Sequence, residues 1–573
     1  MSFEKALEEL EKDRLDNDYT GEYLNIEGMD EKFKIPFRYS VSNKCGVQKY
    51  SPKTEKYETF FPHPIIVSKR IVNKITNWEK VRIEYYDNGV IKSHECDKTT
   101  ISITKNITSL SAYGIKVTSE NARELVKYLA EFMNINTWII PIINSISFFG
   151  WENDTYKNFI PYSCDVVFDG EEIYKELFNG VSCKGDFEKW KYNTHIMLKD
   201  DILRAYMASS FGSVLISILK KLPFVVHLWG GSGVGKTVAL YVAMSIWGNP
   251  EKITTTFNDT VVYTSRKAAI MNNLPLAKNE GETINKKVLS PTEFVYMFCE
   301  KQGRGRGKAD GGVDKIDTWD SIALTNAEGS LLIDNAKEGE LNRVIEFQCS
   351  KPLFENAPQV ADFVKENYGY AGKVFVKELQ KMLKSKQKST LSEYYNTFCG
   401  VYKECGDITE KQILSASIIS LADMLMLHFV YGVDLKEAIE NTKAFSIRIS
   451  GQLKTKTQLD ISERAYQYIV NWITQNQNKF TFDRPDERGT PKEIEPLTET
   501  YGKKVRDEAW IISSVLSNAL KDTNFPIEKT RKGLKDNGYL KHSDNKTKSY
   551  TVQKRINGQK PYCYVINLQN DYC

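Results

Sequence analysis

Apolar and polar positions alternate with a period of two over an early part of the chain. Between Phe33 and Thr104 this alternation recurs in short blocks, such as Val81–Tyr86 (VRIEYY) and Ile101–Ile103. Blocks of this kind predict strands. Asp87-Asn88-Gly89 stands between two of them and predicts a hairpin turn. The first part of the chain is therefore expected to be rich in β-structure.

The period then changes. A helical pattern begins near Thr118, with Thr118 or Ser119 as its cap. A second β-containing stretch, Thr137–Trp190, is rich in aromatic and turn residues. Asp200–Lys221 has apolar residues at helical spacing and leads into the apolar strand Phe224–Trp229. From there to about residue 450 strands and helices alternate, which predicts an α/β domain with a parallel sheet.

The chain has 573 residues and a net charge of only +4. Any nucleic-acid-binding surface must therefore be a local cluster of basic residues. Ten cysteines without a CxxC pair and six histidines argue against a zinc ribbon and a disulfide framework. Met1–Leu10 is a charged amphipathic start, not a signal peptide. No apolar run reaches the roughly 18 residues of a membrane span. A cytoplasmic protein is expected.

A complete phosphate-binding motif, GxxxxGK[ST], follows the strand Phe224–Trp229. Its glycines let backbone N–H groups converge on phosphate oxygens, and the helix predicted at Val238–Trp247 adds its positive N-terminal end. Lys236 supplies charge to the β- and γ-phosphates, and the Thr237 hydroxyl can ligate Mg²⁺. A chance match in a glycine-rich turn is the alternative. The predicted ATP-binding residues are Gly230, Gly231, Ser232, Gly233, Val234, Gly235, Lys236 and Thr237.

A nucleotide site of this kind needs a second strand that positions Mg²⁺ and activates the attacking water. In Leu274–Glu280 (LPLAKNE), Asn279 is the expected metal ligand and Glu280 the catalytic base. Leu331–Asn335 (LLIDN) is the other candidate for this strand, and its residues match the expected pattern better. It lies much further along the chain, so spacing favours Leu274–Glu280. An amide lacks the charge that a carboxylate offers Mg²⁺, so slow turnover is expected. Glu280 could also be a solvated turn residue.

Two more residues are candidates for catalysis. Ile322–Thr325 predicts a third strand that ends in Asn326, whose amide would orient the attacking water or only cap the strand. Arg343 lies at the edge of a further apolar strand in Glu340–Phe347 (ELNRVIEF). It could reach the γ-phosphate of a neighbouring subunit's ATP, or it is a surface arginine.

A loop between the second and third strands alternates glycine with basic residues, in Gly303–Lys308 (GRGRGK). Such a loop cannot pack a core, and its position suggests a hairpin whose charges touch a phosphate backbone. A solvated loop is the alternative. The candidate DNA-binding residues here are Arg304, Arg306 and Lys308.

The C-terminal pattern predicts a winged helix. Glu508–Leu520 has helical periodicity, a turn follows at Asn524-Phe525-Pro526, and Ile527–Asn537 is a second, basic helix. Tyr539-Leu540-Lys541 and Ser549–Val552 would form a β-wing with Tyr562–Leu568, and the second helix would enter a major groove. Protein docking is the alternative role. The basic residues expected on this helix are Lys529, Arg531, Lys532 and Lys535, with Lys546, Lys548, Lys554 and Arg555 on the wing.

The order of these parts resembles the cassette chromosome helicases of staphylococcal mobile elements and, beyond them, the MCM-like hexameric AAA+ helicases. The resemblance covers most of the chain from about residue 80. The phosphate loop is general to many NTPases, whereas SIWG and YGYAG are the more family-specific segments. The matching segments are Phe149-Gly150-Trp151, His227–Thr237 (HLWGGSGVGKT), Ser245–Gly248 (SIWG), Leu274–Glu280 and Tyr368–Gly372 (YGYAG).

The resemblance implies a ring, expected to be a hexamer, with ATP bound between subunits and translocation from 3′ to 5′. In such a ring Glu280 activates water, Asn326 is the sensor, Arg343 acts in trans, and the Gly303–Lys308 hairpin grips single-stranded DNA in the pore. The chain departs from the family at Asn279, where Asp is usual. It also has NAE at residues 326–328, where many relatives have TGE.

We therefore predict an α/β protein: an AAA+ P-loop ATPase core with a β-rich α+β N-terminal region and a C-terminal winged helix. The predicted domains are residues 1–118 (N-terminal α+β), 119–205 (β-containing adaptor), 206–455 (ATPase) and 456–573 (helical linker and winged helix).

The predicted function is an ATP- and Mg²⁺-dependent DNA helicase that acts in replication of a mobile genetic element. Expected partners are single-stranded and duplex DNA, copies of the same chain, and a single-strand-binding protein, primase or polymerase, with no membrane. The alternative is a DNA-binding replication initiator or regulator that uses ATP as an assembly switch without unwinding, which Asn279 favours. A protein-remodelling ATPase would show no stimulation by single-stranded DNA.

Overall fold

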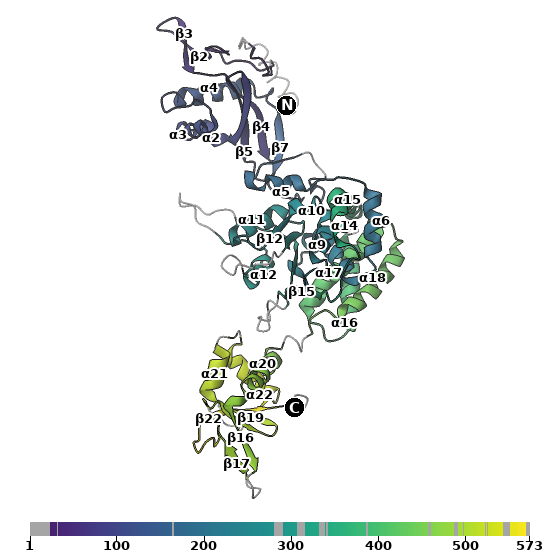
Figure 1. The fold of residues 1–573 in the computed structure, drawn as a ribbon. Coiled ribbons are helices and arrows are strands. Elements are labelled where there is room, and N and C mark those ends of the chain that lie inside the picture. The colour runs from purple at the N-terminus through teal and green to yellow at the C-terminus, as the bar shows by residue number, and fades with distance from the viewer. Residues whose placement is uncertain are drawn as a thin grey trace, which may run out of the picture. The chain divides into compact units, whose positions relative to one another are not determined.

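The structure is a computed structural model (Figure 1). It describes residues 23–30, 32–162, 166–279, 290–305, 316–331, 339, 342–384, 388–455, 460–485, 491–496, 498–521, 523, 525–541 and 550–568. The chain folds as two units. The first comprises Met1–Phe148 with Ser163–Lys175, and the second comprises Phe149–Tyr162 with Glu176–Cys573.

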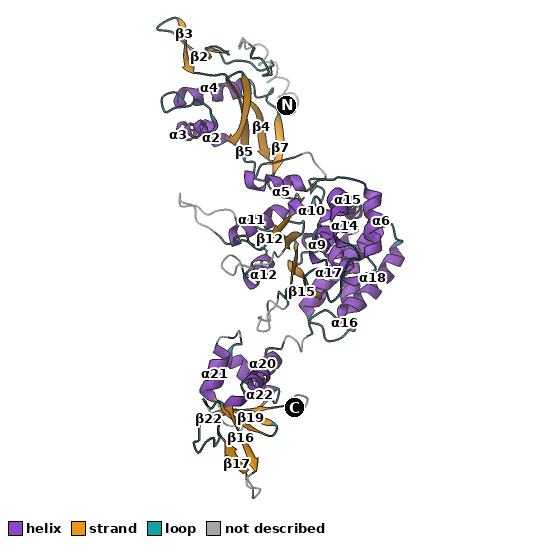
Figure 2. Cartoon of the chain, viewed as in Figure 1, coloured by secondary structure: helices purple, strands orange, loops and turns teal. Residues whose placement is uncertain are grey.

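The first unit is built on a five-stranded sheet with helices gathered on one side (Figure 2). Val81, Ile83 and Tyr85 alternate into its core, which α4 closes with an apolar stripe that includes Tyr128 and Phe132. The sheet order is β10 (Val167–Phe168), β7 (Ile142–Ile146), β4 (Ile65–Asn73), β5 (Glu79–Asp87), β6 (Val90–Asp97). The helices are α2 (Lys98–Ser102), α3 (Thr104–Ile107) and α4 (Ala122–Ile135), and a meander of β1 (Tyr39–Ser42), β2 (Gly46–Ser51) and β3 (Lys56–Phe61) completes the unit.

Local predictions in this unit met different outcomes. The hairpin turn is confirmed, because Asp87 pairs with Val90 and both turn residues have positive φ. The strand predicted at Ile101–Ile103 is wrong: β6 ends at Asp97, and Ile101 enters the core from helix α2. The helix predicted from Thr118 begins only at Ala122, because the Thr118 N–H donates to Asn121 Oδ1 and closes a turn first.

The second unit contains a parallel sheet, as the alternation of strands and helices predicted. Its order is β12 (Thr254–Thr256), β13 (Leu276–Asn279), β14 (Ile322–Ala327), β11 (Phe224–Trp229), β15 (Val344–Gln348). Before β11 come β8 (Gly150–Trp151), β9 (Phe159–Ile160), α5 (Lys175–Gly180), α6 (Phe187–Met197), α7 (Asp201–Gly212) and α8 (Leu215–Ile218). Between the strands lie α9 (Lys236–Ser245), α10 (Pro250–Ile253), α11 (Val261–Met271) and α12 (Pro291–Cys299).

A helical bundle follows β15 in the same unit: α14 (Ala357–Glu366), α15 (Tyr370–Lys384), α16 (Lys388–Glu404), α17 (Glu410–Phe429) and α18 (Leu435–Ser450). In the described part of the chain, α17 alone is long and apolar enough to cross a membrane by length and composition, and 78% of its apolar window is buried inside the protein. Its apolar length therefore fills the core of this bundle.

The segments that carried the family resemblance pack against one another. The N–H groups of Gly369 and Gly372, in YGYAG, donate to the carbonyls of Ser245 and Ile246, in SIWG, at 2.8 Å each. A Cβ on Gly372 would lie 2.5 Å from the buried Trp247 ring. These glycines are needed because two backbones meet there with no room for a side chain.

The C-terminal part of the chain is a helix-turn-helix module with a wing. This module has its own hydrophobic core, to which strand β19, paired with β22, contributes Ala509 and Ile511. The helix predicted at Glu508–Leu520 is therefore wrong over its first half, where the burial alternates with a period of two. The elements are α20 (Ile461–Gln475), β16 (Phe480–Pro485), β17 (Pro491–Ile494), β18 (Gly502–Val505), β19 (Glu508–Ile512), α21 (Ser513–Lys521), α22 (Ile527–Asp536), β20 (Leu540–Lys541), β21 (Val552–Gln553) and β22 (Tyr562–Asn567).

Candidate nucleotide site and nucleic-acid interface

The glycine-rich loop joins strand β11, which lies between β14 and β15, to helix α9 at the carboxyl edge of the parallel sheet. Ligands of α/β proteins bind at this edge. Gly230, Gly233 and Gly235 have φ values of 152°, 79° and 94°, which favour glycine. A Cβ on Gly230 would lie 2.4 Å from the carbonyl oxygen of Cys349, and one on Gly235 would lie 2.9 Å from the ring of Phe354. The loop is thus shaped both by its own dihedral angles and by the segment after β15.

Lys236 and Thr237 begin helix α9 and place their polar groups at the loop. The Lys236 side chain folds back, and its Nζ donates to the carbonyls of Gly230 (2.8 Å) and Gly231 (2.7 Å). The residue is only 9% exposed, so its charge acts in a poorly solvated setting. A buried cation beside the N-terminus of a helix is the arrangement that binds phosphate.

Asn279 ends β13, and Asn326 lies beside it in β14, which continues one residue beyond the predicted end, to Ala327. They are direct partners in the register of β13 and β14, and Asn326 is 2% exposed. The Thr237 hydroxyl donates to Asn279 Oδ1 at 3.1 Å. Adjacent ligands of an octahedral Mg²⁺ lie about 3 Å apart, because each metal–oxygen bond is about 2.1 Å. The two predicted metal ligands therefore fit such an ion, although both are neutral.

His227 supports β14, the strand that carries Asn326. Its Nε2 lies 3.1 Å from the Gly329 carbonyl, so Nε2 carries the proton, and its Nδ1 lies 2.8 Å from the Thr325 hydroxyl. Burial, helped by the charge of Lys236, lowers the pKa of His227 to about 4, although the hydrogen bond with the Gly329 carbonyl acts in the opposite direction. The imidazole is therefore neutral at physiological pH and ties β11 to β14 beside the loop.

Lys278 points away from Asn279 into the opposite side of the sheet. It is 0% exposed, and its Nζ donates to the Thr256 carbonyl (2.8 Å) and to Asp259 Oδ2 (3.0 Å). Burial lowers the pKa of Lys278 to about 8, an effect that Asp259 opposes. The sequence reasoning missed Asp259; its only signal was a lysine in an apolar strand, which requires a buried acidic partner.

Arg343 lies at the other edge of the sheet from the loop. Its carbonyl accepts from the Val225 N–H at the start of β11, whereas the loop follows the end of β11. Five residues of strand separate the two edges by roughly 16 Å. The guanidinium instead lies over the ring of Tyr296, 5.1 Å from its centroid. The Arg343 side chain therefore packs on Tyr296, at the edge of the sheet away from the glycine-rich loop of its own chain.

The basic loop leaves the sheet from an antiparallel base. Gln302 bridges Thr318, and the Gly303 N–H donates to the Asp317 carbonyl at 2.8 Å. Arg304 follows this base and is exposed. Arg306 and Lys308 lie outside the described residues, as do the predicted base Glu280 and the rival segment from Leu332 to Asn335.

Helix α22 divides its basic residues between two faces. Lys529 and Lys532 are exposed and Lys535 is half-buried. Arg531 turns inward: its guanidinium lies over the ring of Tyr564 and donates to Ser517 Oγ at 3.4 Å. The helix ends before Gly538, as predicted, and the wing pairs β21 with β22. Lys554 covers the ring of Trp510, Arg555 is exposed, and Lys546 and Lys548 lie outside the described residues.

Fold and site together define a mixed α/β protein that carries a glycine-rich loop on a parallel sheet and, further along, a helix-turn-helix module. Residues 37–319 match a family model described as a domain of unknown function, DUF927, and residues 460–571 match the Cch helix turn helix domain. No curated protein matches the chain.

Among solved structures the chain is similar to one described as "SCCmec type IV Cch - active helicase". The TM-score is 0.60 at 18% sequence identity, over 93% of this chain and 98% of that chain. At this identity the likeness concerns the fold. The resemblance to the cassette chromosome helicases is thus confirmed, in fold across nearly the whole chain and in its C-terminal module.

Proposed function

We propose that this protein is an ATP-dependent DNA helicase with an AAA+ P-loop core. The observation that carries the proposal is the arrangement at the carboxyl edge of the sheet, where a glycine loop, a buried lysine and three polar side chains meet. The helicase description of the similar structure and the helix-turn-helix module support a DNA-directed role. Cytoplasmic action in replication of a mobile element belongs to the same proposal.

In this proposal Gly230–Thr237 holds the triphosphate of ATP, with Lys236 on the β- and γ-phosphates. Thr237 and Asn279 hold Mg²⁺, which neutralises phosphate charge when bound. Glu280, the residue after Asn279, takes the proton of the attacking water, and Asn326 orients that water. The neutral Asn279 leaves the metal with less ligand charge than a carboxylate gives, so hydrolysis is expected to be slow.

The chain acts as a ring, for which we propose a hexamer moving 3′ to 5′ on single-stranded DNA. The position of Arg343 supports assembly, because its own loop lies at the far edge of the sheet, and the arginine would stabilise charge on ATP bound to the next copy. Arg304, Arg306 and Lys308 would hold the strand in the pore, while Lys529, Arg531, Lys532 and Lys535 belong to a duplex-binding helix.

The proposal is tested by Lys236→Ala. This variant should lose ATP hydrolysis and unwinding of a forked substrate while remaining folded, since the lysine bonds only backbone carbonyls of its own loop. Hydrolysis is measured with and without single-stranded DNA, and mass photometry gives the ring size. Normal unwinding by the variant would refute the site.

The second candidate is an ATP-switched DNA-binding initiator or regulator, and Asn279 in place of a carboxylate favours it. Strand displacement separates the two: an initiator binds ATP and DNA but leaves a forked duplex intact. Asn279→Asp should then speed hydrolysis, because it restores charge to the metal site.

A further inference from the structure

Helix α7 is bound tightly to the sheet that carries the site. The fully buried Tyr206 donates its hydroxyl to the Thr325 carbonyl at 3.1 Å, one residue before Asn326. Ser210 donates to the Ala243 carbonyl of α9 at 2.7 Å and accepts from Trp247 Nε1 at 3.0 Å. Helix α7 is therefore hydrogen-bonded both to β14 and to α9 with the Trp247 that follows it.

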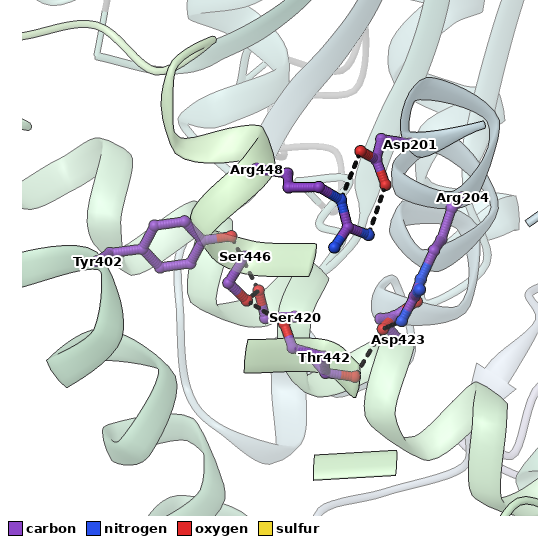
Figure 3. A network of polar contacts seen from close by, with 8 residues as sticks. All are labelled: Asp201, Arg204, Tyr402, Ser420, Asp423, Thr442, Ser446 and Arg448. Atoms are coloured by element: carbon purple, nitrogen blue, oxygen red, sulfur yellow. Dashed lines mark hydrogen bonds and ion pairs between the residues drawn. The ribbon is translucent and has the colours of Figure 1, made fainter. Parts of the chain in front are cut away.

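The same helix is bound to the bundle after β15 by a buried ion pair (Figure 3). Arg204 makes a bidentate contact with Asp423 of α17, at 2.7 and 2.6 Å. Thr442 of α18 donates to the same carboxylate at 2.6 Å, and the Arg204 guanidinium lies over the ring of Phe445. One carboxylate thus joins three helices.

In a second bidentate pair the acidic residue is on α7 and the arginine is on the bundle. Arg448 of α18 donates two hydrogen bonds, of 2.8 and 2.9 Å, to the carboxylate of Asp201, which lies one turn before Arg204. This pair is half-exposed. Bidentate pairs set orientation as well as distance, so the two pairs fix how α17 and α18 are oriented against α7 in this structure. Neither kind of pair adds much net stability: a buried ion pair contributes little compared with apolar packing, and an exposed ion pair contributes little at all. The effect of the two pairs here is therefore mainly geometric.

We propose that α7 couples the nucleotide site to α17 and α18. Tyr206 is a positioning residue for Asn326, and the pairs Arg204–Asp423 and Asp201–Arg448 make the two bundle helices follow the state of the site. This inference rests on the proposed ATP site. It assigns a role in the ATPase cycle to residues that never touch the nucleotide.

The half-exposed pair allows a test in the full-length protein. Hydrogen exchange is measured with and without ADP in two peptides, residues 230–245 and 435–450. In the wild type, ADP should slow exchange in both. Arg448→Ala should keep the protection of the loop and weaken that of α18, which stays joined to α7 only through Thr442 and Asp423. The exchanged pair Asp201→Arg with Arg448→Asp should restore it.

Lys443→Ala is the matched control, because Lys443 forms its ion pair with Glu440 within α18. It should behave as the wild type. The coupling is refuted if α18 of the wild type ignores ADP while the loop is protected, or if Arg448→Ala responds like the wild type. An unprotected wild-type loop would instead refute the nucleotide site, and the coupling with it.

Tyr206→Phe tests the contact with β14 without changing the packing. It should lower kcat roughly three- to tenfold, the factor for one ordinary hydrogen bond, and leave KM for ATP unchanged. Tyr402→Phe is the control, since Tyr402 is equally buried and its hydroxyl pairs with Ser420 inside the bundle. If kcat is unchanged, or falls equally in the control, Tyr206 does not position Asn326 and only packs in the core.

Discussion

His227 shows how one buried side chain makes stability depend on pH. Its folded-state pKa of about 4 lies below the ordinary value of 6.5. Between these values the unfolded chain binds more protons than the folded chain. The contribution of His227 to the free energy of unfolding is therefore fully present above pH 6.5 and is lost as the pH falls towards 4.

The variant His227→Gln removes this titration and keeps a polar side chain. Between pH 6.5 and 4 the free energy of unfolding should fall by about 3 kcal/mol more in the wild type than in the variant, because 6.5 minus 4 is 2.5 pKa units. Urea unfolding of both proteins at several pH values measures the difference. His63, whose pKa burial also lowers to about 4, is present in both and cancels. Parallel pH profiles would contradict the prediction.

Lys278 and Asp259 predict an asymmetry between two substitutions. Asp259 accepts from both Lys278 (3.0 Å) and Lys267 (3.4 Å). Lys278→Met leaves the carboxylate paired with Lys267, so the free energy of unfolding should change by no more than about 1 kcal/mol. Asp259→Ala removes the acidic partner of both lysines, so the free energy of unfolding should fall by about 3–5 kcal/mol. Thermal unfolding of both variants checks the order, and equal losses would contradict it.

At the scale of elements, the sequence predicted best where local pattern and local chemistry agree. The strand Phe224–Trp229 and the glycine loop were predicted from pattern and motif alone, and the structure contains both. The helix predicted at Val238–Trp247 follows them as α9, which begins and ends two residues earlier, at Lys236 and Ser245. Ile101 and the segment Glu508–Ile512 failed for one reason: a few apolar residues fit either period, and the tertiary partner decides. Ile511 is a strand residue because β22 lies beside it.

Helix α22 predicts different outcomes for its basic residues. Lys529→Ala with Lys532→Ala should weaken duplex binding and reduce the slope of log affinity against log salt by about 2, since each lysine on a phosphate contributes about 0.9. Arg531→Ala should leave that slope nearly unchanged and destabilise the module, because its guanidinium packs on Tyr564. Fluorescence anisotropy at several salt concentrations measures both. An unchanged slope in the double variant would indicate protein docking.

At the scale of the whole molecule, the placement of Arg343 predicts a site shared between copies. Lys236→Ala and Arg343→Ala should each abolish hydrolysis alone. An equal mixture should recover activity, because roughly a quarter of random interfaces combine an intact loop with an intact arginine. ATPase assays of the mixture, reassembled after dissociation, measure this. A mixture as inactive as its components would mean that Arg343 acts within its own chain.

The sequence by itself determined the features that depend on near neighbours in the chain: the phosphate loop, the alternation behind the parallel sheet, the hairpin turn at Asn88-Gly89 and the basic helix of the C-terminal module. Their physical cause is local, in backbone dihedral angles and in the period of apolar side chains. Only the tertiary structure decided which distant groups meet. It brought Thr237 to Asn279, gave the buried Lys278 its partner Asp259, turned Arg531 inward, and joined α7 to α17 and α18 through Asp423, because ion pairs and packing act across space and leave no period in the sequence.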